Sequence, residues 1–147
     1  MSLDFVPKRV ILHCSATPDY PPDNKAFDLI GAADIDSWHK QRGFNYPGGS
    51  IGYHKVIRQS GELEDGRPEH LQGAHCKGQN KDTLGICIIG NGRFNHDQVQ
   101  TLGELYEMYN SWYGIDYTAW FAHYEFTKKK TCPNAPIDLV RAYFRLL

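Results

Sequence analysis

The chain has 147 residues, of which 41% are hydrophobic and 22% are charged, and its formal net charge is −1. This length suits one domain around one core, so residues 1–147 are expected to form a single domain. The charge balance lacks the basic excess that is typical of nucleic-acid binding. No apolar run approaches the roughly 20 residues that a membrane-spanning helix requires. Neither a nucleic acid nor a membrane is therefore expected as a partner.

The N-terminal half is predicted to contain a strand, a helix and a hairpin, in that order. A first strand is expected at about 9–12, and its apolar run at 10–12 is typical of a strand that is buried on both faces. The helix that follows should end near Gly43, where a glycine stop is expected. Strands at about 51–58 and 62–65, joined by a turn at 59–61, should form the hairpin. The predicted buried face of the helix consists of Ile30, Ala33, Ile35, Trp38 and His39.

The C-terminal half is predicted to alternate strands at 84–89 and 118–122 with two helices. Asn95 or Asp97 should cap a long helix, and a second helix should close the chain at 137–147. The apolar face of the long helix is predicted to consist of Val99, Leu102, Leu105, Tyr106, Tyr109 and Trp112. Because helices alternate with strands, the expected fold class is α/β, with a mixed central β-sheet flanked by helices on both faces.

Two histidines close apolar strands at opposite ends of the sequence. His13 follows the strand at 9–12, and His123 follows the strand at 118–122. Ligand sites in open α/β sheets gather beyond the strand ends, and Cys132 lies on a loop shortly after His123. Two imidazoles and one thiolate that leave a fourth position open are typical of a catalytic zinc. For either histidine alone, a hydrogen-bonded core residue is the better interpretation; a zinc site at the strand ends requires all three residues together.

The four cysteines are expected to be free thiols or metal ligands. Residues 1–4 do not begin a charged and then apolar leader, so the protein should be made in the cytoplasm without a signal peptide. Cys87 lies inside an apolar strand, where core packing is expected. Cys14 should point to the face opposite His13, so the two should not reach one metal. His39, near a helix end, is expected to carry a charge that suits the helix dipole.

The segment Ala122-His123-Tyr124-Glu125, followed by Lys130-Thr131-Cys132-Pro133, resembles the type 2 N-acetylmuramoyl-L-alanine amidases. This family includes small phage lysozyme-amidases and the peptidoglycan recognition proteins. The resemblance continues in the family's order from about Arg9 to Asp138. Further matching segments are His13-Cys14-Ser15-Ala16-Thr17, Trp38-His39-Lys40-Gln41-Arg42-Gly43-Phe44, Ile51-Gly52-Tyr53-His54, and Gly73-Ala74-His75 with Asn80.

The resemblance implies a role for each matching site residue. It makes His13, His123 and Cys132 the ligands of a Zn²⁺ ion. It makes Tyr53 and Lys130 catalytic residues that do not bind the metal, and it places His75 and Asn80 in the substrate cleft.

The chemistry of two side chains suits these implied roles. A cationic lysine can stabilise the oxyanion that forms at an attacked amide carbonyl, and Tyr53 can orient water or assist proton transfer. Lys129 is an alternative to Lys130, although the spacing to Cys132 favours Lys130. His54 should point to the face opposite Tyr53 and lie outside the site.

The function that the resemblance implies is zinc-dependent hydrolysis of the amide bond between N-acetylmuramic acid and L-alanine in peptidoglycan. A phage or prophage endolysin, monomeric and released to the cell wall through a holin-type route, fits the expected absence of a signal peptide. Two alternatives are a cytosolic muropeptide-recycling amidase, which generally uses an aspartate as third ligand, and a non-catalytic peptidoglycan receptor, which typically lacks the cysteine. Some small phage amidases also inhibit the phage RNA polymerase, and no residue indicates or excludes that activity here.

Overall fold

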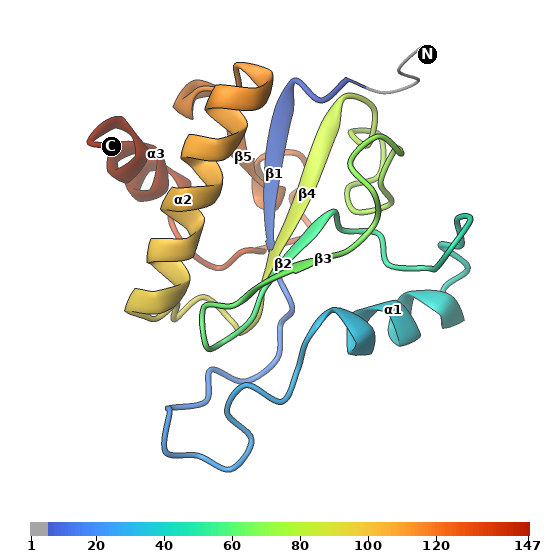
Figure 1. The fold of residues 1–147 in the computed structure, drawn as a ribbon, viewed down its shortest axis with the longest axis vertical. Helices are drawn as coiled ribbons and strands as arrows, with labels where there is room; N and C mark the ends of the chain where they lie inside the picture. Colours follow the sequence, from blue (N-terminus) through green and yellow to red (C-terminus); the bar gives the residue numbers. More distant parts are fainter. Residues whose placement is uncertain (1–5) are drawn as a thin grey trace.

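The computed structural model describes residues 6–147, which form a five-stranded sheet in the order β3-β2-β4-β1-β5 (Figure 1). The inner strands β1, β4 and β2 and the edge strand β5 run parallel, and β3 is antiparallel to β2. The strands are β1 Arg9–Cys14, β2 Lys55–Ile57, β3 Leu63–Asp65, β4 Thr83–Ile88 and β5 Trp120–Ala122. The helices are α1 Ala32–Gln41, α2 His96–Tyr113 and α3 Ile137–Arg145, with 3-10 turns at Tyr117–Ala119 and His123–Glu125.

Helices cover both faces of the sheet. Alternate side chains of the central strands, such as Leu12 and Ile86, pack in one apolar cluster with α2 and α3. Cys87 and Val56 join a second cluster with Ile35 of α1. Figure 1 shows α2 and α3 side by side, with α1 on the opposite side of the strands. The predicted α/β class, with a mixed sheet between helices, is confirmed.

Helix α2 begins and ends at residues that suit helix termini. The Asn95 side chain accepts from the Gln98 N–H at 2.9 Å, and the Gln98 side chain accepts from the Asn95 N–H at 3.1 Å. This reciprocal pair is a capping box. Gly114 ends the helix with a φ of 68°, a left-handed conformation that favours glycine. Of the two predicted caps, Asn95 is therefore the correct one.

The predicted buried faces of α1 and α2 were partly wrong. Trp112 is 61% exposed, because the buried stripe of α2 runs through Leu102, Tyr106 and Tyr109 and continues at Tyr113, one residue further on. In α1, Ile35 is buried, whereas Trp38 is 42% exposed and Ala33 is also exposed. A short helix that buries two side chains needs only a narrow stripe, so its flanking apolar residues remain in solvent.

The segment 51–54 is not part of the strand predicted at 51–58. A Cβ at Gly52 would lie 2.0 Å from the Ala74 carbonyl oxygen, so the two segments approach closely. The Gly52 N–H donates to Nδ1 of His39 at 2.8 Å instead of to a neighbouring strand. Ladder pairing starts only at Lys55, and the irregular segment directs Tyr53 toward the end of the sheet.

None of the helices in the described part of the chain is both long enough and apolar enough to cross a membrane.

Candidate metal centre

The two strand-end histidines meet at the carboxyl ends of β1 and β5. His13 lies in β1, beside Cys87 of β4, and His123 begins the turn directly after β5. The loop that carries Cys132 is held to both elements, because Tyr124 N–H donates to the Cys132 carbonyl at 3.0 Å and Cys14 N–H donates to Cys132 Sγ at 2.9 Å. The parallel pairing of β1 and β5 thus brings His13 next to His123, which lies 110 positions later in the sequence, and next to the loop that carries Cys132.

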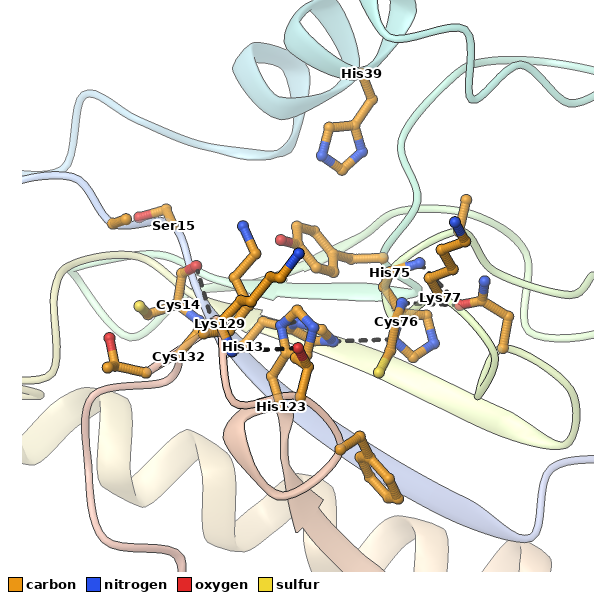
Figure 2. A pocket seen from close by; sticks show the side chains of 18 of the residues that line it. His13, Cys14, Ser15, His39, His75, Cys76, Lys77, His123, Lys129 and Cys132 are labelled. Carbon is orange, nitrogen blue, oxygen red and sulfur yellow. Dashed lines mark hydrogen bonds between the residues drawn. The ribbon is translucent and has the colours of Figure 1, made fainter.

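The three side chains form a compact group of possible metal donors. Nδ1 of His13 lies 3.1 Å from Nδ1 of His123. One ligand atom from each of His13, His123 and Cys132 lies within 4.8 Å of the others. Figure 2 shows His13 in the middle of the group, with Cys132 on one side and His75 on the other. Two imidazole nitrogens and one thiolate are donors that zinc prefers, and three protein ligands leave one position for water or substrate.

The electrostatics keep the two histidines neutral, which is the form that binds a metal. Burial lowers the pKa of His13 well below its ordinary value, and the neighbouring His75 and His123 lower it further. Burial also lowers the pKa of His123, and the positive charge of Lys130 adds to this shift. The imidazoles of His13 and His123 therefore each offer a lone pair near neutral pH.

Cys14 and Cys132 interact at the edge of the group, where Cys132 Sγ accepts from the Cys14 N–H at 2.9 Å. The interaction between the two thiols lowers the pKa of Cys14 and raises the pKa of Cys132. A metal ion deprotonates a coordinating thiol outright, so the raised pKa of Cys132 does not argue against its role as a ligand. Cys14 does not belong to the donor group, although it lines the same cleft.

A cleft of about 1020 Å³ opens above the donor group. Four cationic side chains line it, and its described lining includes no aspartate or glutamate. These cations belong to three separate segments and lie at Arg42, Lys77, Lys129 and Lys130. The lining of the cleft therefore carries a net positive charge, although the net charge of the whole chain is −1.

Tyr53 and the two lysines proposed for catalysis line the same cleft as the donor group. The ring centroid of Tyr53 lies 5.0 Å from that of His13. Burial raises the pKa of Tyr53 well above 10, so its hydroxyl remains protonated at neutral pH. Lys129 and Lys130 are exposed and line the cleft, and the charge of Lys130 adds to the lowering of the His123 pKa. The choice of Lys130 over Lys129 stays a prediction.

His75 and Asn80 also line the cleft, but they contact other parts of the protein as well. The Asn80 side-chain oxygen accepts from the backbone N–H groups of His75 and Cys76, both at 2.9 Å. Nδ1 of His75 lies 2.9 Å from Nε2 of His13. Contact with substrate remains a prediction for both residues, and the structure adds a direct contact between His75 and a metal-ligand candidate.

The expectation of a charged His39 was wrong. His39 as a whole residue is 6% exposed, its Nδ1 accepts from the Gly52 N–H at 2.8 Å, and burial lowers its pKa to about 4. It packs against Tyr53 with ring centroids 5.3 Å apart, so it supports the catalytic candidate as a neutral ring. Helical spacing alone could not reveal this role, because the partner atom lies in another segment.

His54 lies behind the cleft, as its predicted orientation away from Tyr53 implied. Its Nδ1 accepts from the Gly85 N–H at 3.0 Å, and its Nε2 lies 2.8 Å from the Leu71 carbonyl oxygen. Burial lowers its pKa to about 4. Its ring centroid lies 6.0 Å from that of His75, so it forms the layer that supports His75.

A fold that places two histidines at the ends of parallel strands, beside a cysteine on a neighbouring loop and below a cationic cleft, defines a candidate metallohydrolase. The sequence model of the family described as N-acetylmuramoyl-L-alanine amidase matches residues 4–135. The chain therefore belongs to the type 2 N-acetylmuramoyl-L-alanine amidase family, and the resemblance read from the sequence motifs is confirmed.

Individual relatives agree with this family. The chain is 32% identical to the endolysin of Klebsiella phage KP32 over 143 residues, which cover 90% of this chain and 83% of that protein. It is 35% identical to the endolysin of Escherichia phage T7 over 104 residues, which cover 65% of this chain and 62% of that protein. The solved structure of N-acetylmuramoyl-L-alanine amidase LysC from Clostridium intestinale URNW superposes with a TM-score of 0.79 and 29% identity, and the match covers 98% of this chain and 89% of LysC.

Proposed function

We propose that this chain is a zinc-dependent amidase that hydrolyses the bond between N-acetylmuramic acid and L-alanine in peptidoglycan. The observation that supports this most directly is the group of His13, His123 and Cys132 at the base of a cleft that Tyr53 and Lys130 also line. The proposal takes residues 1–147 as one amidase domain that acts as a monomer.

A bound zinc would be held by His13, His123 and Cys132 and would supply Lewis acidity to water and to the amide carbonyl. The remaining roles belong to the chain itself. The Lys130 ammonium at the rim can stabilise the negative charge that develops on the carbonyl oxygen. The protonated hydroxyl of Tyr53 can donate a hydrogen bond to the reacting groups or accept one from water.

The charge of the cleft supports an acidic substrate. Stem peptides of peptidoglycan carry free carboxylates, and the cleft presents four cations without a lining carboxylate among the described residues. Opposite charges across a binding cleft accelerate association and orient the ligand. We therefore assign the cleft to the peptide attached to the muramic acid, with the scissile amide above the donor group.

The phage relatives support an endolysin as the biological role. The matched proteins of phages KP32 and T7 are both endolysins. In this proposal the protein acts on the cell wall after release through a holin-type route. The cysteine in the donor group favours this role over that of a recycling amidase or of a non-catalytic receptor, the two alternatives that the motifs left open.

Metal analysis combined with a digestion assay tests the proposal. Purified protein should contain one zinc per chain and release new N-terminal L-alanine from peptidoglycan, without new reducing sugar ends. Cys132→Ser should lower both zinc content and activity, because a neutral hydroxyl replaces a thiolate. The exposed His70→Ala should leave both unchanged and serves as control. Zinc-loaded protein that binds peptidoglycan but releases no L-alanine would contradict the amidase and favour the receptor.

A further inference from the structure

A second row of polar side chains lies directly behind His13. Nε2 of His13 is 2.9 Å from Nδ1 of His75, and Nε2 of His75 is 3.2 Å from Oγ1 of Thr83. Oγ1 of Thr83 in turn lies 2.6 Å from the Gln79 carbonyl oxygen and 3.2 Å from that of Asn80. Figure 2 shows His75 beside His13, on the side opposite Cys132. These contacts connect the donor group, through two side chains, to the backbone carbonyl oxygens of Gln79 and Asn80.

We propose that His75 and Thr83 are positioning residues that fix the tautomer of His13 and hold its Nδ1 lone pair toward the metal. This inference rests on the proposed metal centre, since it assigns His13 Nδ1 as a ligand atom. Residues that hold a metal-binding histidine through its second nitrogen orient the ring and raise its basicity.

The direction of each hydrogen bond in the row His13–His75–Thr83 follows from the two backbone carbonyl oxygens next to Thr83. The hydroxyl of Thr83 faces two carbonyl oxygens, which can only accept, so its single proton must point toward one of them. Oγ1 is then an acceptor for Nε2–H of His75. A neutral His75 ring with its proton on Nε2 has an acceptor at Nδ1, so Nε2 of His13 must be the donor. The proton of His13 is thereby placed away from the donor group.

The consequence for the donor group is a free lone pair at Nδ1 of His13. The same atom lies 3.1 Å from Nδ1 of His123 and faces the possible metal position. We call the hydrogen-bonded row His13–His75–Thr83 the relay. If its hydrogen bonds ran in the opposite direction, Nδ1 of His13 would carry the proton and would have to lose it before it could bind a metal. The relay thus prepares His13 as a ligand before any ion arrives.

The fold reserves space for the His75 ring. A Cβ at Gly85 of β4 would lie 2.4 Å from Cγ and 2.8 Å from Nδ1 of His75, and a Cβ at Gly73 would lie 2.7 Å from its Cδ2. Thr83 begins the same strand and is fully buried. Alternate residues of one strand therefore supply both the hydrogen-bond partner of His75 and the room for its ring.

The tautomer states can be measured by ¹H–¹⁵N NMR of the histidine side chains in the metal-free protein. We expect His13 and His75 each to carry a proton on Nε2 and none on Nδ1. In Thr83→Val, which keeps the shape but removes the hydroxyl, a population with protonated Nδ1 should appear in both rings. Thr83→Ser should restore the single tautomer. Protonation of His13 at Nδ1 in the wild-type protein, or unchanged tautomers in Thr83→Val, would overturn the relay.

Zinc affinity, measured by competition with a chelator of known affinity, gives the second readout. His75→Ala should weaken zinc binding by about 10- to 100-fold, and Thr83→Val by a smaller factor that Thr83→Ser recovers. The exposed His70→Ala controls for the loss of a histidine, and circular dichroism checks that each variant is folded. Unchanged affinity in a folded His75→Ala protein would refute the positioning role. Wild-type protein that binds no zinc but shows the expected tautomers would instead refute the metal centre and leave the relay standing.

Discussion

At the residue scale, the two side chains assigned to the chemistry differ in how the protein holds them. Tyr53 is partly buried between the rings of His13 and His39, with centroid distances of 5.0 and 5.3 Å. Lys130 is exposed at the rim of the cleft, and its charge acts on His123. Packing thus fixes the orientation of Tyr53, whereas Lys130 can move when a substrate fills the cleft.

Replacing Lys130 or Lys129 one at a time shows which of the two lysines stabilises the oxyanion. Lys130→Ala should lower amidase turnover by about 10²- to 10³-fold, the usual effect of removing one oxyanion-stabilising group. Zinc content should remain at the wild-type level, because the side chain is not a ligand. Lys129→Ala, which removes the same charge from the neighbouring position, is the matched control and should change turnover only a few-fold. The reverse result would assign the role to Lys129.

At the element scale, the site depends on the parallel order of β5, β1 and β4. Their carboxyl ends share one edge of the sheet, so His123, His13 and Cys87 become neighbours. The sequence predicted these elements from apolar runs and glycine stops. It missed the irregular segment at 51–54, because the close approach of Gly52 to Ala74 is a tertiary contact.

Gly85 in β4 provides an element-scale test of the packing behind His13. Gly85→Ala should lower the free energy of unfolding by about 1–3 kcal/mol, the usual cost of overpacking, because its Cβ would meet the His75 ring at 2.4 Å. Urea denaturation measures this change.

The His75→Ala background is the control for this prediction. In that protein the ring is absent, so the cost of Gly85→Ala should shrink, and the coupling is expected to be about 0.5–3 kcal/mol. An equal cost in both backgrounds would show that Gly85 does not make room for His75.

At the scale of the whole molecule, buried neutral histidines connect the site to the stability of the fold. His39 and His54 each accept a backbone N–H through Nδ1, from Gly52 and Gly85 respectively. Burial lowers the pKa of each to about 4. Protonation would place a hydrogen where each ring accepts one, so both contacts require the neutral form.

The folded protein should therefore lose stability in mildly acidic solution. An unfolded histidine has a pKa of about 6.5, so the unfolded state binds more protons than the folded state at lower pH. The contribution of His39 and His54 is complete above about pH 6.5 and is lost as the pH falls toward 4. Each can contribute up to about 1.4 kcal/mol per pH unit in this window.

Urea denaturation of the metal-free protein at pH 7 and pH 5 measures this loss. His39→Gln keeps an acceptor that does not titrate, so this variant should show a smaller difference between the two pH values. His70→Ala, which removes an exposed histidine, should behave like the wild-type protein. Stability that does not change between pH 7 and pH 5 would contradict the neutral assignment.

The sequence by itself determined the family and the order of the elements, and it predicted the three candidate donor residues. Apolar runs, caps and glycine stops are local patterns, and the family motifs state which residues recur at fixed positions. Even without the family, His13 and His123 could be singled out because each closes an apolar strand. The charged state expected for His39 was wrong because helical spacing contains no information about the atom that faces the ring.

Only the tertiary structure decided how the donor group is supported. Nε2 of His13 meets His75 across 62 positions of sequence, Gly85 meets His54 across 31, and the two donor histidines meet across 110. Strand order and register create these contacts, and no local pattern encodes them. The direction of the His13–His75–Thr83 relay depends further on two backbone carbonyl oxygens at Thr83. Backbone atoms are the same at every position, so their placement becomes visible only in the folded chain.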